Sequence, residues 1–249
     1  MAIVQTFHTG VSLNLWEECC LRSFVDHGHE VVLFSYDQLD LPPGARLLAA
    51  DEIVPESERA AFFAMAPGQF GQFSDLFRYE LLHARGGWWV DTDMLCPAPD
   101  LSEEEIVIGR KLSIKRRNRY RINGAVMRFP AGHALLEEAT TFMRANADLI
   151  GSSWRSVAGP DLLTRLVPQY GIEAQETSLF YPNRGRCQLE FLRPREARRS
   201  CRGGFGLAQG PSLARALPGR RAAARSIAAR WKLFGGSLRE ARRRRRSLS

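Results

Sequence analysis

The chain has 249 residues, of which 45% are hydrophobic and 25% charged, and its formal net charge is +8. This length allows one α/β domain with an appendage, and the ordinary apolar content excludes a disordered chain. The charge is divided unevenly, because residues 1–182 hold 16 Lys and Arg against 24 Asp and Glu, whereas residues 183–249 hold 19 against 3. We therefore expect a mildly acidic domain over 1–182 and a separate, Arg-rich tail over 183–249.

Strand-like and helix-like patterns alternate through the first 182 residues. The expected strands are Ala2–Phe7, His29–Tyr36, Trp88–Val90, Ile106–Ile108 and Asn123–Phe129, with a short apolar piece around Leu47. The expected helices are Ser12–Val25 with a serine at its start, Ser74–Arg85, Gly132–Ala147, and a last one that opens at Gly159–Pro160 and runs through Val167. Such alternation predicts an α/β sheet that is covered by helices. Beyond Pro182 the pattern ends, and we expect a poorly ordered tail with one weakly helical stretch.

Signals for membranes, export and cysteine sites are missing from the sequence. The longest apolar runs are far shorter than the roughly 20 residues that a membrane-spanning helix needs. Met1–Val4 leads directly into a strand-like run without the basic start of a secretory signal, so we expect a cytoplasmic protein. The five cysteines are irregularly spaced and form neither a disulfide framework nor a Cys-x-x-Cys metal motif.

The helix expected over Ser74–Arg85 places two charged residues on one face. Asp75 and Arg78 are three residues apart, and we expect Asp75 in the first turn, where the helix dipole favours a carboxylate. One interpretation is a local ion pair on a solvated face, which contributes little. The other is a polar face at the mouth of a cleft, where Asp75 accepts hydrogen bonds from sugar hydroxyls and Arg78 donates to a sugar or phosphate.

Two carboxylates follow the short strand Trp88–Val90. Asp91 and Asp93 are two residues apart and therefore point to the same side of the chain. Close carboxylates repel each other, so a partly desolvated pair stays ionised only with a cation present. Oxygen ligands suit Mg²⁺ or Mn²⁺, which bind through one or two carboxylates together with substrate phosphates. The pair predicts a divalent metal site that neutralises a departing nucleoside diphosphate.

These residues resemble a known family. The run from Phe73 to Tyr79, then Leu82 and the run from Gly86 to Asp93, is similar to glycosyltransferases that have a sugar-binding region with a DXD motif. That group includes capsular-polysaccharide synthesis proteins and, more distantly, initiating mannosyltransferases and the clostridial glucosylating toxins. Further landmarks lie at Ser12, Ser23–Phe24, Gly28–Val31, Tyr36, Asn123–Val126, Gly159–Pro160 and Phe180–Pro182. The likeness covers roughly residues 2–182.

The resemblance implies a GT-A-like fold, that is, a Rossmann-like mixed sheet flanked by helices. It implies transfer of a sugar, with retention at the anomeric carbon, from a nucleoside-diphosphate sugar such as a UDP-sugar to a hydroxyl acceptor in polysaccharide or glycoconjugate synthesis. It places Asp75 and Arg78 at the donor, and Asp91 and Asp93 at the metal and the donor's diphosphate or ribose. No carboxylate nucleophile is identifiable, so the catalytic residue stays unassigned.

Two positions depart from the family pattern. Phe7 stands where capsular-type members carry a Trp near the nucleobase, which keeps an aromatic ring there. After Pro182 the family's His-Leu-Trp-type segment is replaced by an Arg-, Ala- and Gly-rich run. One hypothesis is a shifted reading frame near residues 183–200, because out-of-frame GC-rich DNA encodes such residues. The alternative is a genuine, lineage-specific tail. If the tail is instead spurious, we expect poor donor binding or no activity, so an inactive or truncated homologue is a further interpretation.

Other functions fit parts of the sequence. A haloacid-dehalogenase-like phosphatase also carries Asp-x-Asp after a buried strand, but its motif requires Thr or Val at the position where this chain has Leu95. The tail, ending in Arg242–Arg246, favours contact with an anionic inner-membrane surface over nucleic acid, for which no binding motif accompanies the charge. The basic run Lys111–Arg121 is expected as a solvated, mobile loop, or else as a contact for an acidic acceptor. Asn123 is a candidate donor ligand or a strand-entry turn residue.

Overall fold

The computed structural model describes residues 1–96, 99–113, 119–147, 157–177 and 206–207. The tail expected over 183–249 lies outside these residues except for Gly206–Leu207, as do the landmark Phe180–Pro182 and the arginine run near the C-terminus. Among the described residues, no helix is both long and apolar enough to cross a membrane.

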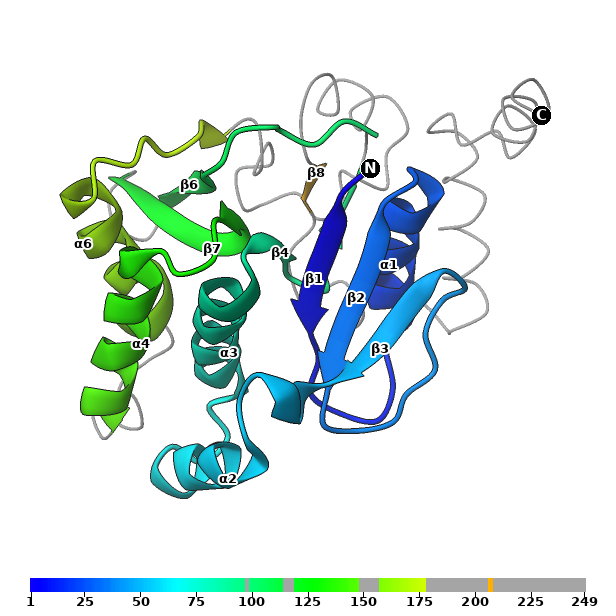
Figure 1. Cartoon of the computed structure of the whole chain (residues 1–249), viewed down its shortest axis with the longest axis horizontal. Helices are drawn as coiled ribbons and strands as arrows, with labels where there is room; N and C mark the ends of the chain where they lie inside the picture. The colour runs from blue at the N-terminus through cyan, green and yellow to red at the C-terminus, as the bar shows by residue number, and fades with distance from the viewer. Residues whose placement is uncertain (97–98, 114–118, 148–156, 178–205, 208–249) are drawn as a thin grey trace.

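A six-stranded sheet forms the centre of the molecule (Figure 1), with the strand order β3-β2-β1-β4-β7-β6. The strands are β1 (Ile3–Phe7), β2 (Glu30–Ser35), β3 (Ala45–Ala49), β4 (Gly87–Val90), β6 (Val107–Ser113) and β7 (Arg119–Phe129). β3, β2, β1 and β4 are parallel to one another, while β7 is antiparallel to both β4 and β6. The expected mixed α/β sheet is therefore confirmed.

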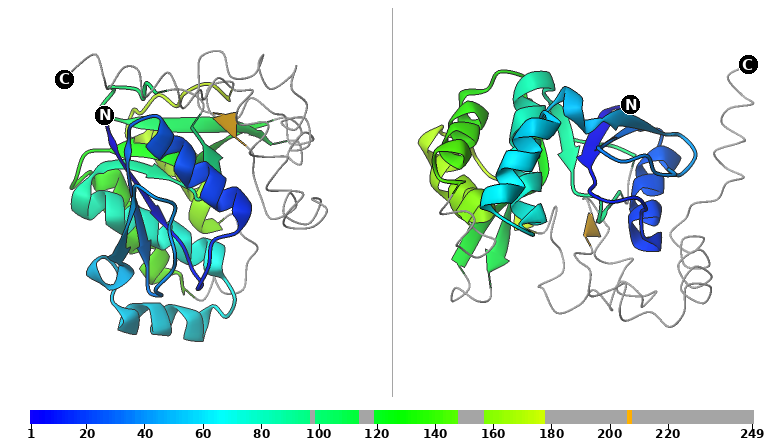
Figure 2. Two further views of the ribbon diagram at one scale, coloured as in Figure 1. Left: turned by 90° about the vertical axis from the view of Figure 1, so that its right-hand side faces the viewer. Right: turned by 90° about the horizontal axis from the view of Figure 1, so that it is seen from below.

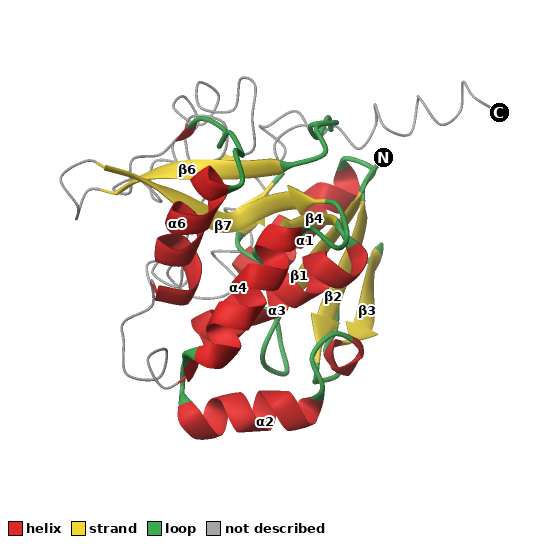
Figure 3. Ribbon diagram, turned by 60° about the vertical axis from the view of Figure 1, so that its left-hand side comes forward, coloured by secondary structure: helices red, strands yellow, loops and turns green. Residues whose placement is uncertain are grey.

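Helices cover both faces of this sheet (Figures 2 and 3). α1 (Leu15–Asp26) lies on one face, and α3 (Phe70–Arg85), α4 (Ala134–Ala145) and α6 (Leu162–Gln169) lie on the other. α2 (Glu56–Met65) lies beyond the carboxyl ends of β1, β2 and β3. No helix was expected at the position of α2.

Alternation along the strands divides the core into two apolar clusters. On β4, Trp88 packs in the cluster that includes Phe24 of α1, whereas Trp89 packs in the cluster that includes Phe77 of α3. Both tryptophans are almost fully buried, at 3% and 1% exposed. Because successive strand residues point to opposite faces, a strand of four residues anchors both helical layers.

Helix α3 begins at Phe70, four residues before the expected start, and this corrects the position of Asp75. Asp75 lies in the second turn, so the expectation that the helix dipole favours its carboxylate is wrong. The expected end is confirmed, because Gly86 caps the helix with φ 63°. A Cβ on Gly86 would lie 2.6 Å from the backbone nitrogen of Ala131, so this turn requires glycine.

Two other helix starts also differ from expectation. α1 is capped by Asn14, whose side chain accepts hydrogen bonds from the backbone of Trp16 and Glu17, and not by the expected serine. Pro160 does not open an α-helix but lies in a π-type turn, Val157–Asp161, and α6 begins after it. Gly159 in that turn has non-helical backbone angles.

The order of the strands reverses at β1, which creates a topological switch point between β1 and β4. From β1 the chain proceeds to β2 and then β3 on one side, and afterwards returns to place β4 on the other side of β1. In open α/β sheets, ligands bind outside the carboxyl ends of the strands at such a switch point. Asp91 directly follows β4 and therefore lies at this point. Immediately beyond it, β5 (Met94–Leu95) pairs with β8 (Gly206–Leu207) in a separate small sheet.

Candidate donor and metal site

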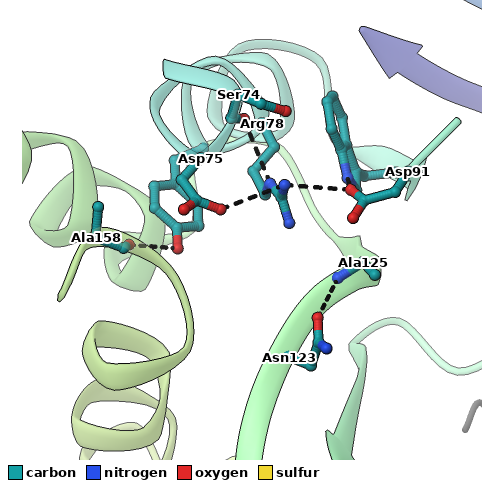
Figure 4. A network of polar contacts seen from close by, with 9 residues as sticks. Ser74, Asp75, Arg78, Asp91, Asn123, Ala125 and Ala158 are labelled. Atoms are coloured by element: carbon teal, nitrogen blue, oxygen red, sulfur yellow. Dashed lines mark hydrogen bonds and ion pairs between the residues drawn. The ribbon is translucent and has the colours of Figure 1, made fainter. Parts of the chain in front are cut away.

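Three predicted site residues meet in one polar network (Figure 4). A single nitrogen of Arg78, Nη2, lies 3.3 Å from Asp75 Oδ1 and 3.2 Å from Asp91 Oδ1. Arg78 Nε also donates to the carbonyl oxygen of Ser74, 3.4 Å away. The guanidinium of Arg78 thus links a carboxylate on its own helix to the first carboxylate after β4.

Asp75 and Arg78 are buried, at 7% and 6% exposed. The interpretation of this pair as an ion pair on a solvated face is therefore wrong. Burial raises the pKa of Asp75 to about 6, the charge of Arg78 opposes that rise, and the carboxylate of Asp91 adds to it. Asp91 is more accessible, because 29% of its side chain is exposed.

Trp89 orients Asp91, a contact that the sequence analysis did not anticipate. Trp89 Nε1 donates to Asp91 Oδ1 at 2.9 Å, and the guanidinium of Arg78 lies 5.1 Å from the centre of a Trp89 ring. The backbone nitrogen of Asp91 donates to Ala125 O of β7 at 2.8 Å. These contacts hold Oδ1 of Asp91 toward α3.

Two glycines allow the network to pack this closely. A Cβ on Gly124 would lie 2.6 Å from Arg78 Nη1, and a Cβ on Gly159 would lie 2.6 Å from Asp75 Oδ2. Next to Asp75, the hydroxyl of the buried Tyr79 donates to Ala158 O at 2.9 Å. The landmark glycines in the sequence are thus explained by close approach of β7 and the π-type turn to α3.

Asn123 lies inside β7 and not at its entry, so the interpretation as a strand-entry turn is wrong. Its Oδ1 accepts a hydrogen bond from the backbone nitrogen of Ala125 at 2.9 Å. The register of β6 against β7 shifts between Ile108 and Gly109, which pair with Met127 and Asn123. The pair Asn123–Gly124 therefore lies at a register irregularity within β7 and not at a turn. Figure 4 shows Asn123 near this network on β7, and a role in donor binding stays a prediction.

Asp93 lies past the end of β4, in a turn that is closed by a hydrogen bond from Met94 N to Asp91 O at 3.0 Å, and its own backbone carbonyl accepts a hydrogen bond from Trp16 Nε1 at 3.4 Å. The expectation that strand alternation points Asp91 and Asp93 to the same side is therefore wrong, because the strand ends before both residues. Burial lowers the pKa of Lys111 below its usual value, and the carboxylates of Asp93 and Asp91 oppose part of this shift. Carboxylate oxygens are the kind of ligand that Mg²⁺ and Mn²⁺ prefer, and a metal site at Asp91 and Asp93 stays a prediction. Within the described ranges, no group of three His, Cys, Asp or Glu side chains gathers as a complete metal site.

The two described ends of the run Lys111–Arg121 lie in strands, where a solvated loop was expected. Lys111 belongs to β6 and pairs with Arg121 of β7, and residues 114–118 between these strands lie outside the described residues. Lys111 is half-buried and faces the charges of Asp93 and Asp91, while Arg121 forms an ion pair with Asp161. Sequence spacing gave no sign that Lys111 lies beside the carboxylate pair.

Phe7, the aromatic residue expected near a nucleobase, is buried at 6% exposed. Its ring stacks on Phe77 with centroids 4.1 Å apart and an interplanar angle of 16°. The edges of Tyr36 and Phe73 pack around it at 6.0 and 5.8 Å. Phe7 therefore belongs to the core, and Phe77 covers one face of its ring.

Comparison with known proteins identifies the fold but no family. No protein-family model and no curated protein matches the chain. A solved structure described as the PaToxG glycosyltransferase matches with a TM-score of 0.53 and 12% identity, over 68% of this chain and 68% of that chain. Another, described only as a transferase, reaches a TM-score of 0.40 with 10% identity over 69% of this chain and 86% of that chain, and is too distant to bear on the fold. The chain thus shares the fold of a glycosyltransferase.

Proposed function

We propose that this protein is a metal-dependent glycosyltransferase. It moves a sugar from a nucleoside-diphosphate sugar, in our proposal a UDP-sugar, to a hydroxyl of a glycan or other acceptor, with retention at the anomeric carbon. The supporting observation is the Arg78 guanidinium, which bridges Asp75 and Asp91 at the switch point of the sheet. The shared fold agrees with this proposal but does not establish it, because proteins of one fold can have many different functions.

The buried pair has the chemistry to orient a sugar. Asp75 accepts hydrogen bonds from hydroxyls, and Arg78 has further N–H groups for a hydroxyl or a phosphate oxygen. Because both side chains are buried and linked, they are held in place before the donor arrives. Such preorganised polar groups stabilise developing charge more strongly than mobile groups in water. In the same proposal Asn123, on the neighbouring β7, contributes a further hydrogen bond to the donor.

Asp91 and Asp93 would hold Mg²⁺ or Mn²⁺, with the donor's phosphates as further ligands. Asp91 Oδ1 is engaged by Trp89 and Arg78, which leaves Oδ2 as its available ligand atom. When bound, the ion neutralises the diphosphate and makes it a better leaving group. Lys111 adds a second positive charge beside the same carboxylates.

The basic tail supports a second, separate proposal about location. Residues 183–249 hold 19 Lys and Arg against 3 Asp and Glu, a charge that favours an anionic membrane surface. We propose that the enzyme works in the cytoplasm, at the inner membrane surface. Salt-sensitive retention on anionic vesicles should disappear when the chain is truncated after Pro182, and retention without the tail would contradict this proposal.

The proposed reaction is tested by donor hydrolysis. Purified protein is incubated with Mn²⁺ and a panel of UDP- and GDP-sugars, beside Asp93→Ala and a control, Asp100→Ala, which changes an exposed aspartate outside the network. We expect release of nucleoside diphosphate from one donor by the wild type and the control only, and loss of release with EDTA. Release that is equal in Asp93→Ala, or unaffected by EDTA, would contradict the metal role. No release and no metal-dependent donor binding would contradict the function.

A further inference from the structure

A cavity lies on the same edge of the sheet, and the residues of the Arg78 network do not line it. It has a volume of about 560 Å³ and is bounded by the ends of β2 and β3 and by α2. The lining residues that carry the argument are Tyr36, Asp37, Asp51, Glu56 and Arg59. Its size falls in the range of roughly 300–1,000 Å³ that small-molecule sites have.

One wall is a fixed aromatic and cationic unit. The guanidinium of Arg59 lies 4.6 Å above the centre of the Tyr36 ring, and Arg59 Nη1 donates to Glu56 Oε1 at 2.6 Å. Tyr36 Oη donates to Val54 O at 2.6 Å, and burial raises the pKa of Tyr36, so this hydroxyl keeps its proton. Arg59 Nε has no hydrogen-bond partner within the part of the chain that the structure describes.

Other lining residues of the cavity carry carboxylates, which accept hydrogen bonds. Asp51 Oδ1 receives the backbone N–H of Glu56 at 2.7 Å, which fixes that carboxylate at the start of α2. Asp37 adds a third carboxylate from the segment after β2. β3 is an edge strand of the six-stranded sheet, so one side of its backbone has no neighbouring strand there. The cavity therefore offers several acceptors and few donors.

This chemistry disfavours a phosphate and a stacked base. Three carboxylates against one guanidinium, itself paired with Glu56, repel a phosphate. Stacking of a base on Tyr36 is disfavoured as well, because Arg59 covers one face of its ring and Phe7 and Phe73 pack around it. A ring with several hydroxyls fits better, because each hydroxyl donates to a carboxylate and also accepts from an N–H.

We infer that this cavity binds a sugar ring without acidic groups, as a subsite for the acceptor glycan. The acceptor role, but not the binding of a sugar, rests on the proposed function. Since neighbouring strands are about 4.8 Å apart, β2 and β3 lie roughly 10 and 14 Å from β4, where Asp91 is. That separation exceeds one sugar ring, so the cavity holds a unit further along the glycan than the one that is modified.

Saturation-transfer NMR on the full chain tests the inference. The probes are methyl β-glucoside, methyl β-N-acetylglucosaminide and methyl β-glucuronide. The variants are Asp37→Asn and Glu56→Gln, and the matched control is Asp40→Asn, which makes the same change at an exposed residue of the same loop outside the cavity. A thermal melt of each variant verifies folding.

We expect saturation transfer to one or both uncharged sugars and none to the glucuronide. Binding should weaken about tenfold in Asp37→Asn and in Glu56→Gln, the loss expected for a hydrogen bond to a charged group, and stay unchanged in Asp40→Asn. Equal binding in all variants, binding of the glucuronide, or no binding by the wild type would overturn the inference.

The two proposals fail in different ways. Asp93→Ala should lose donor hydrolysis but still bind the uncharged sugar, because Asp93 follows β4 and does not line the cavity. If the wild type hydrolyses a donor but binds no sugar, the proposed function stands and the acceptor subsite is wrong. If it binds sugar but hydrolyses no donor, the cavity remains a sugar site and the transferase proposal is wrong.

Discussion

Arg78 Nη2 lies 3.2 Å from Asp91 Oδ1, although the two residues belong to different elements and are separated by the whole turn from α3 into β4. The same nitrogen contacts Asp75 at 3.3 Å. The Arg78 guanidinium therefore joins the Asp75–Arg78 pair of α3 to Asp91, which follows β4, in one polar network.

Replacing Arg78 should destabilise the protein strongly. Arg78→Ala leaves the buried Asp75 carboxylate without its cation, so we expect a loss of roughly 3–5 kcal/mol in the free energy of unfolding. Arg22→Ala is the control, because its partner Asp26 is 3.6 Å away at an exposed site, and its cost should be about 0–1 kcal/mol. Urea unfolding at pH 7 measures both variants. Similar costs would show that the buried link contributes no more than a surface pair.

The pKa of Asp75 predicts a pH dependence of stability. The folded pKa of about 6 lies above the ordinary value of 3.8 for this carboxyl group, so the folded state binds this proton more tightly than the unfolded state. The contribution of Asp75 is therefore most favourable below pH 3.8 and decreases as the pH rises to about 6. The groups that set this value are the surrounding apolar core, Arg78 and Asp91.

Asp75→Asn isolates this effect. Relative to the wild type, the variant should gain roughly 2–2.5 kcal/mol in the free energy of unfolding between pH 4 and pH 7, because one pKa unit corresponds to about 1.4 kcal/mol and a small part of the effect occurs below pH 4. Urea unfolding at several pH values measures the difference, and comparison with the wild type cancels groups that both proteins share. A difference that does not change with pH would contradict the raised pKa.

Gly124→Ala should displace Arg78. The new Cβ would lie 2.6 Å from Arg78 Nη1 and 3.2 Å from Leu163 Cδ1, so we expect a loss of about 1–3 kcal/mol in stability together with reduced donor hydrolysis. Gly71→Ala is the control, because nothing lies within 4 Å of its added Cβ. Alanine within helix α3 should instead stabilise by about 0.5–1 kcal/mol. Thermal melts and the hydrolysis assay would reveal the difference, and unchanged hydrolysis in Gly124→Ala would argue against a role of Arg78 at the donor.

Metal and nucleotide together should stabilise the wild type. At a concentration near 100 times the dissociation constant, a ligand adds about 2.7 kcal/mol, which corresponds to roughly 5–10 °C in the melting temperature of a chain of this size. We expect this shift with Mn²⁺ and UDP, its disappearance with EDTA, and its absence in Asp91→Asn and Asp93→Asn. A full shift in both variants would mean that these carboxylates do not hold the metal.

The sequence determined the local features of this protein. Apolar runs and glycine pairs predicted the strands around Phe7, Val31 and Trp89 and the end of α3 at Gly86, because these depend on contacts between near neighbours in the chain. The spacing of Asp91 and Asp93 at a strand end likewise indicated a metal site. The role of that pair stays a prediction.

Only the tertiary structure decided how these features meet. Burial of Asp75 and Arg78 arises from packing of β7 and the π-type turn against α3, through Gly124 and Gly159, which are distant in sequence. Lys111 lies beside the carboxylates of Asp91 and Asp93 because β6 pairs with β7. The cavity that Tyr36 and Arg59 line exists because α2 lies beyond β2 and β3. Helix and strand periodicity specifies which residues lie on one face of an element. Which other element packs against that face depends on the connections between the strands, and these are set by the tertiary structure.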